Sequence, residues 1–148
     1  MNTLDIDEKL KHVEGFLGAF PYDKIPKSRK KFYSMIVNTE PDSEPGDHWL
    51  VLVYRRGRFW FLDSFGRDYN NFTFSIAFQN TIRNYIAGRP HVFNRKLLQQ
   101  FTSNACGFYA CYFVHMFSKR SLPTNLVSNF TDNLKRNDMY VRDYVSKI

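Results

Sequence analysis

The stretch that most restricts the fold is a largely apolar and aromatic run at 106–118, which follows a polar approach at 99–105. A run of this length and character predicts a helix buried in the core. Ser103 and Asn104 are good N-cap types, so Cys106 would lie in the first turn of that helix. The free N–H groups and the helix dipole favour a thiolate there, and the thiolate is the nucleophilic form of cysteine. Gly107 would let a substrate backbone approach closely.

A cysteine in an apolar helix has simpler interpretations. Free cysteine is among the most buried residue types, so Cys106 alone could be a core residue. Cys111 and His115 have the i, i+4 spacing of a half metal site, but no second ligand pair lies nearby, and no metal is predicted. His115 is nine positions after Cys106 and faces the other side of the helix. His12 and His91 read as surface histidines without an acid partner.

Length and composition predict one globular domain over residues 1–148. Hydrophobic residues make up 43% of the chain and aromatic residues 18%, which excludes a disordered chain. No apolar run is long enough to cross a membrane, and the acidic N-terminal segment is no secretory signal. Two cysteines, five positions apart on one helix, predict no disulfide and a reducing compartment. We therefore expect an intracellular, non-secreted monomer with no membrane partner.

The net charge of +7 would draw the chain to a polyanion, of which nucleic acid is the common one. Basic residues cluster at 24–31 and at 55–58. Neither cluster is a sequence-specific motif, so any contact with DNA would be to phosphate. The other interpretation is that the protein is basic and soluble but does not bind nucleic acid.

Periodicity predicts an α+β chain. We expect helices at 5–17 (capped by Asp5 or Asp7), 74–87, from the cap Thr124 to about 136, and 138–147, and strands at 32–37, 48–54, 58–63 and 91–101. A turn at 55–57 makes a hairpin of the second and third strands. The apolar run at 48–54 is typical of a strand buried on both faces. His48 opens that hairpin and Asp63 closes it, so both would lie at one edge of the sheet.

His48, Asp63 and Cys106 are the residue types of a catalytic triad. His48 would take or hold the proton of Cys106, and Asp63 would orient the imidazole and stabilise its charge. Asp47, next to His48, would face the other way along the strand. Gln99 or Gln100 could donate to a developing oxyanion, together with the backbone N–H of Cys106.

These motifs resemble the adenovirus-type (adenain-like) cysteine proteases and their relatives, the SUMO-specific proteases. The resemblance covers residues 14–118 and rests on five segments in order: Phe16-Leu-Gly18 with Tyr22-Asp-Lys24, Met35-Ile-Val-Asn-Thr39, His48-Trp49, Phe61-Leu-Asp63-Ser-Phe-Gly66, and Gln99 to Cys106-Gly107. The acid is Glu in the adenoviral enzymes and Asp in the SUMO-protease relatives.

The resemblance implies a papain-like core with a mixed central sheet and a central helix that carries the nucleophile. It implies a cysteine endopeptidase that cleaves viral precursor proteins of the capsid or core at small-residue, Gly-containing sites. Cys106 would be the nucleophile, His48 the base, Asp63 its orienter and Gln99 the oxyanion donor, with Gln100 as the alternative. Trp49 would shape the cleft, and Gly107 would lie along the substrate.

The resemblance also bears on location and activation. It places the protein in a virion or in the interior of an infected cell, without a cofactor. Adenoviral enzymes are stimulated by a viral peptide that is disulfide-linked to a cysteine upstream of the glutamine. No cysteine precedes Cys106, so that linkage cannot form here. The resemblance is still compatible with stimulation by DNA or by a peptide that binds without a disulfide.

Two other functions fit the same residues. One is a protease that removes ubiquitin or SUMO from conjugates, and its substrate would distinguish it from a viral maturation enzyme. The other is a catalytically silent, basic, nucleic-acid-binding virion protein. All four types of site residue are present, which argues against lost chemistry.

Overall fold

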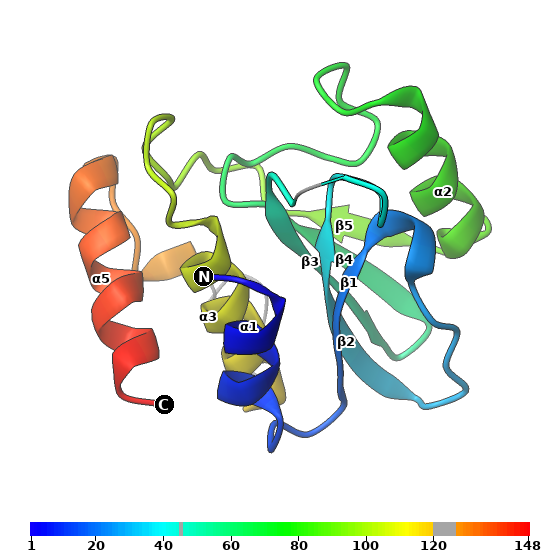
Figure 1. Ribbon diagram of the computed structural model, residues 1–148, viewed down its shortest axis with the longest axis horizontal. Coiled ribbons are helices and arrows are strands. Elements are labelled where there is room, and N and C mark those ends of the chain that lie inside the picture. Colours follow the sequence, from blue (N-terminus) through cyan, green and yellow to red (C-terminus); the bar gives the residue numbers. More distant parts are fainter. Residues whose placement is uncertain (45, 120–126) are drawn as a thin grey trace.

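A computed structural model describes residues 1–44, 46–119 and 127–148 and shows a five-stranded mixed sheet between helices (Figure 1). The strands follow the chain in the order β1-β2-β3-β4-β5. The outer pairs β1–β2 and β4–β5 are parallel and the inner pairs are antiparallel. The elements are α1 (Thr3–Leu10), β1 (Phe16–Pro21), the 3₁₀ helix η1 (Tyr22–Lys24), β2 (Phe32–Asn38), β3 (Trp49–Arg55), β4 (Arg58–Leu62), α2 (Ile76–Ile86), β5 (His91–Phe93), α3 (Cys106–Ser118) and α5 (Leu134–Ser146).

The helices cover both faces of the sheet. One core cluster joins the sheet to α1, α3 and α5, and a second joins the other face to α2. Strand β3 contributes to both, because Val51 and Val53 face α3 while Leu50 and Leu52 face α2. This confirms the strand buried on both faces and the α+β fold with a central helix that begins at Cys106.

The hairpin β3–β4 forms as predicted. Its turn residues Arg56 and Gly57 have positive φ values of 53° and 77°, the geometry of a tight two-residue turn. Val51 pairs with Leu62 in the register. His48 and Asp63, one residue beyond each strand, therefore come to the same edge of the sheet.

The prediction for residues 5–17 is wrong at both ends. The helix starts at Thr3, where Asn2 forms a capping box with Asp5, and it ends at Leu10. Residues 16 and 17 belong to β1, which pairs with β2. Phe16 and Leu17 fit a helical stripe, but pairing with a strand that is distant in sequence overrides this local pattern.

Two further predictions need correction. The strand expected at 91–101 ends at Phe93, and an irregular loop continues to Ala105. The helix break expected at residue 137 is absent, because α5 runs unbroken through it with Asn133 as its cap. The predicted cap Thr124 lies outside the described residues.

Helix α3 has the predicted bounds but not the predicted cap. Ala105 occupies the N-cap position, and no side chain caps the helix. The free N–H groups of its first turn are thus left for other partners beside Cys106. In the described part of the chain, no helix is long and apolar enough to span a membrane.

Candidate active site

His48 and Asp63 form a buried pair at the edge of the sheet. His48 Nε2 lies 2.6 Å from Asp63 Oδ1, and the two residues are 8% and 0% exposed. The ring of Phe65 stacks on the imidazole at a centroid distance of 5.1 Å. Because Asp63 occupies Nε2, Nδ1 is the ring nitrogen left for another partner.

Cys106 is the first residue of α3, and its thiol and the imidazole of His48 each shift the pKa of the other. Burial would raise the pKa of the Cys106 thiol. The hydrogen bond to His48 and its charge, together with the backbone N–H groups of Trp49 and Gly107, reverse that effect and lower the pKa. Burial would likewise lower the pKa of His48, but Asp63 and Cys106 raise it to about 9. These opposite shifts favour a thiolate paired with an imidazolium.

Two residues that the sequence analysis did not single out hold Asp63. Arg67 Nε donates to Asp63 Oδ2 at 2.7 Å. Asn94 holds the backbone, since its Oδ1 accepts from Asp63 N and its Nδ2 donates to Asp63 O. Burial would raise the pKa of the Asp63 carboxyl, but His48 and Arg67 lower it, so the buried acid is ionised. In the sequence, the arginine four positions after the acid was the feature that could have indicated this contact.

Gln99 does not lie as an oxyanion donor would. The residue is 1% exposed, and both its side-chain oxygen and its side-chain nitrogen already form hydrogen bonds. Its Oε1 accepts from Ser64 Oγ, while Nε2 donates to Ser103 O at 2.9 Å and to Ser103 Oγ at 3.2 Å. Gln100 is half-buried, and its amide forms no hydrogen bond within the described ranges. The geometry is at odds with the role expected for Gln99.

The loop before Cys106 is fixed along its length. The backbone N–H groups of Leu98 and Gln99 both donate to Ser64 O, at 2.9 and 3.1 Å. The carbonyl of Leu98 accepts from Tyr109 Oη at 3.0 Å and from Asn137 Nδ2 at 3.1 Å. Helices α3 and α5 thus hold the loop from one side, and the strand end that carries Asp63 holds it from the other.

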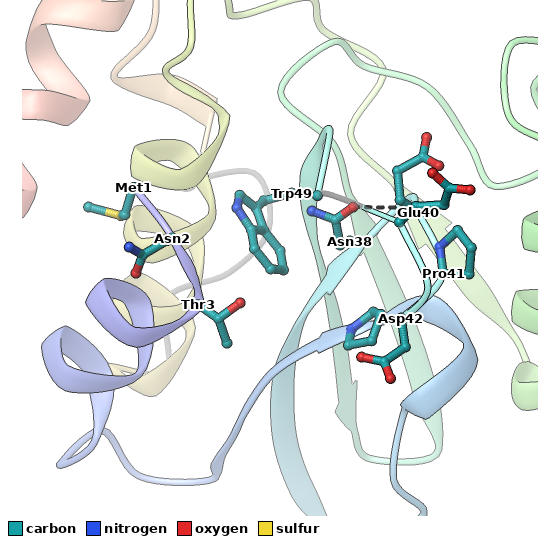
Figure 2. Close-up of a pocket in the computed structure, with 11 residues that line it drawn as sticks. Met1, Asn2, Thr3, Asn38, Glu40, Pro41, Asp42 and Trp49 are labelled. Atoms are coloured by element: carbon teal, nitrogen blue, oxygen red, sulfur yellow. Dashed lines mark hydrogen bonds between the residues drawn. The ribbon is translucent and has the colours of Figure 1, made fainter.

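Trp49 and Gly107 lie beside Cys106, with surroundings different from those expected. Trp49 lines a pocket of about 260 Å³ with residues 1–3 and the loop after β2 (Figure 2). The space over Gly107 is filled, because an added Cβ would lie 3.2 Å from the Met1 side chain. The close approach that Gly107 allows is therefore made by Met1.

The remaining histidines and Cys111 stand apart from this site. His91 was expected to have no acid partner, but its Nε2 lies 2.9 Å from Asp68 Oδ2, so that prediction is wrong. His115 bonds to Tyr144 Oη at 2.6 Å. Burial raises the pKa of Cys111 to about 12, so this thiol is inert. Within the described residues, no three His, Cys, Asp or Glu side chains are placed to hold a metal.

The sequence matches a known family over most of its length. The model of the Ulp1 protease family, C-terminal catalytic domain, matches residues 26–146. The chain belongs to the Ulp1 protease family. This confirms the predicted class, a cysteine protease related to the SUMO-specific proteases. No curated protein is significantly similar in sequence.

Solved structures share the fold at low identity. The ASFV pS273R protease is 13% identical, with a TM-score of 0.60 over 95% of this chain and 65% of its own. The SUMO protease Ulp1, with its catalytic cysteine oxidised to a sulfinic acid, is 13% identical, with a TM-score of 0.57 over 99% and 78%. ChlaDub1 from Chlamydia trachomatis is 15% identical, with a TM-score of 0.54 over 81% and 60%. The chain thus spans somewhat less than two thirds of the ASFV protease.

Proposed function

We propose that this Ulp1-family chain hydrolyses peptide bonds through Cys106, His48 and Asp63. The observation that carries the proposal is the buried His48–Asp63 pair, whose imidazole has its second nitrogen free for a thiol at the start of α3. The opposite pKa shifts of His48 and Cys106 support a preformed ion pair. Asp63, held by Arg67, keeps the imidazole oriented and stabilises its charge.

The reaction proceeds in two steps. The Cys106 thiolate attacks the carbonyl carbon, and the tetrahedral intermediate collapses as the His48 imidazolium gives its proton to the leaving amine. The thioester is then attacked by water, whose proton passes to His48. Collapse of the second intermediate releases the carboxylic acid product and restores the thiolate–imidazolium pair.

The oxyanion needs donors next to Cys106. The backbone N–H of Cys106 lies in the uncapped first turn of α3 and is one donor. We assign the second to the side chain of Gln100, because the amide of Gln99 is already bound to Ser64 and Ser103. Gln99 then acts as a positioning residue that fixes the loop behind Gln100.

The substrate class follows from the resemblance. A viral capsid or core precursor, cut at a Gly-containing site inside a virion or an infected cell, is the first candidate. The likeness in fold to the SUMO protease Ulp1 supports the second, a folded ubiquitin-like protein. Trp49, which lines a pocket with residues 1–3 and the loop after β2, would contact either substrate.

Two substrate sets separate the candidates. We expect wild-type protein to cleave unstructured peptides with Gly-containing junctions, and both Cys106→Ala and His48→Ala to abolish cleavage. Cys111→Ser, which changes the inert thiol, should leave it intact. Cleavage confined to the fluorogenic C-terminal amides of ubiquitin or SUMO would select the deconjugating activity. Cleavage of neither set would favour the silent nucleic-acid-binding protein.

A second proposal concerns DNA and a different part of the molecule. Phe32 pairs with Arg55, and Arg55 pairs with Arg58, so the basic segments at 24–31 and 55–58 approach each other at one end of the sheet. His48 and Asp63 lie at the opposite end of β3 and β4. We propose that this basic end binds nucleic-acid phosphates, whether or not DNA stimulates cleavage. Binding to a DNA duplex that weakens with salt, and is lost in Arg55→Gln/Arg58→Gln, tests this.

A further inference from the structure

A groove lies beside His48, and it adjoins the pocket that Trp49 lines. It has a volume of about 810 Å³ and extends from the loop after β2 to the exposed ring of Phe101. The imidazole of His48 and the ring of Phe65 lie along it. A substrate that reached Cys106 and His48 would therefore extend into this groove.

One wall of the groove is acidic. Residues 40–47 carry four acids and no Lys or Arg, in a chain whose net charge is +7. Of these acids, Glu40, Glu44 and Asp47 line the groove, and Glu40 and Glu44 also line the neighbouring pocket that holds Trp49. Among the described residues that line the groove, Arg67 has the one fixed positive charge, and Asp63 already neutralises it.

The facing wall is aromatic. Phe72 and Phe101 are 90% and 75% exposed, which is unusual for phenylalanine. Phe101 stacks on Phe65 at a centroid distance of 5.8 Å, so a continuous aromatic surface leads from the groove to His48. Exposed rings and carboxylates that line one groove suit a side chain that has an apolar stem and a cationic head.

We propose that this groove binds a lysine or arginine side chain of the substrate within a few residues of the scissile bond. The inference rests on the proposed function and specifies its substrate. The stem of the basic residue packs on Phe72 and Phe101, and its charge faces Glu40 and Glu44. Because the Cys106–His48 pair and the Asp63–Arg67 pair each balance their own charge, the groove carboxylates are left for the ligand.

The first test compares matched peptides. A junction that the enzyme cleaves, found in a library of decapeptides, is remade with Arg, Lys, Gln or Glu at each flanking position. We expect Arg and Lys to exceed Gln by roughly fivefold or more in kcat/KM at low salt and to lose most of that advantage in high salt. In Glu40→Gln/Glu44→Gln the ratio should fall towards one.

The control carries the same change at the other end of the sheet. Glu14 is exposed and lies beside Lys31 and Arg55, far from the groove. Glu14→Gln should keep the wild-type ratio of kcat/KM between the Arg or Lys peptides and the Gln peptide. Cleavage that ignores the charge of the flanking residue, or a preference that survives Glu40→Gln/Glu44→Gln, would overturn the proposal while leaving the protease assignment intact.

A binding measurement separates the two claims. Fluorescein-labelled decapeptides with one arginine or one glutamine among glycine, alanine and leucine are titrated with the Cys106→Ala protein. Tighter binding of the arginine peptide, lost on changing Glu40 and Glu44, supports the groove even if no peptide is cleaved by the wild type. Equal binding of both peptides would count against the groove independently of catalysis.

Discussion

The side chain of Gln99 accepts a hydrogen bond from Ser64 Oγ, and both residues are buried. Ser64 follows the acid of the catalytic pair, while Gln99 lies in the loop that leads to the nucleophile. A second bond from Gln99 to Ser103 completes the connection. The strand end that carries Asp63 is therefore tied directly to the approach to Cys106.

Gln99 and its neighbour Gln100 should respond differently to the same substitution. Gln99→Ala leaves the buried hydroxyl of Ser64 without its partner and removes the bonds to the half-buried Ser103, and it should cost about 1–3 kcal/mol of unfolding free energy. Gln100→Ala should leave stability unchanged but lower kcat by about 10²–10³, the usual effect of losing one oxyanion donor. Urea denaturation and peptide cleavage measure the two effects. If Gln99→Ala is stable and inactive, Gln99 is the donor after all.

Asp63→Asn should uncouple His48 from its orienting charge. The pKa of His48, now raised to about 9, should fall because Asp63 no longer stabilises the imidazolium while burial still lowers it. We expect kcat to drop by about 10⁴, as it does when a triad acid becomes an amide. A ¹H–¹⁵N NMR titration of the imidazole checks the pKa; an unchanged value would mean that Asp63 does not act through His48.

The pH profile of kcat/KM should be a broad bell. Protonation of the Cys106 thiolate sets its acid limb, below the range of an ordinary thiol because the pKa of Cys106 is lowered. The alkaline limb should fall near pH 9, where His48 loses the proton it gives to the leaving group. A profile that still rises through this pH would show that His48 is not protonated in the active form.

Gly66 should tolerate no side chain. Its φ is +73°, and an added Cβ would lie 2.8 Å from backbone atoms of Arg95 and Lys96. Gly66→Ala should therefore lower the free energy of unfolding clearly more than Gly57→Ala does. Gly57 has a similar φ of +77°, but an added Cβ would meet nothing within 4 Å. Gly57→Ala should therefore lose only about 1–2 kcal/mol of unfolding free energy, from backbone strain. Equal losses in thermal or urea unfolding would mean that the loop at 95–96 moves aside freely.

The sequence was most informative where local pattern and tertiary structure agree. The continuous apolar run of β3, the turn at Arg56–Gly57 and the apolar length of α3 all predict the observed elements. Hairpin geometry also predicts that His48 and Asp63 meet, because register links the two ends of a hairpin. No local pattern brings Cys106 to them, so that part of the prediction rests on the residue types of a triad and on the resemblance to a known order of motifs.

The failures lie where distant contacts decide. Residues 16 and 17 join β1 through pairing with β2. The loop at 94–105 is held by the backbone carbonyl and hydroxyl of Ser64 and by the side chains of Tyr109 and Asn137 rather than by a sheet. The use of the Gln99 amide depends on those same contacts. Neighbouring glutamines are indistinguishable by type, so their different environments appear only in three dimensions.

The most direct test of the account is the alkylation rate of Cys106 by iodoacetamide, measured from about pH 4 to about pH 9 in wild type and in His48→Ala. Peptide mapping keeps Cys111 as an internal reference. We predict that wild-type Cys106 is alkylated at pH values well below the pKa of about 8.5 of a free thiol, and that in His48→Ala its alkylation follows that ordinary pKa. If the alkylation rate of Cys106 followed the pH dependence of an ordinary thiol in both proteins, or if Cys111 alone reacted, the thiolate–imidazolium pair would be contradicted.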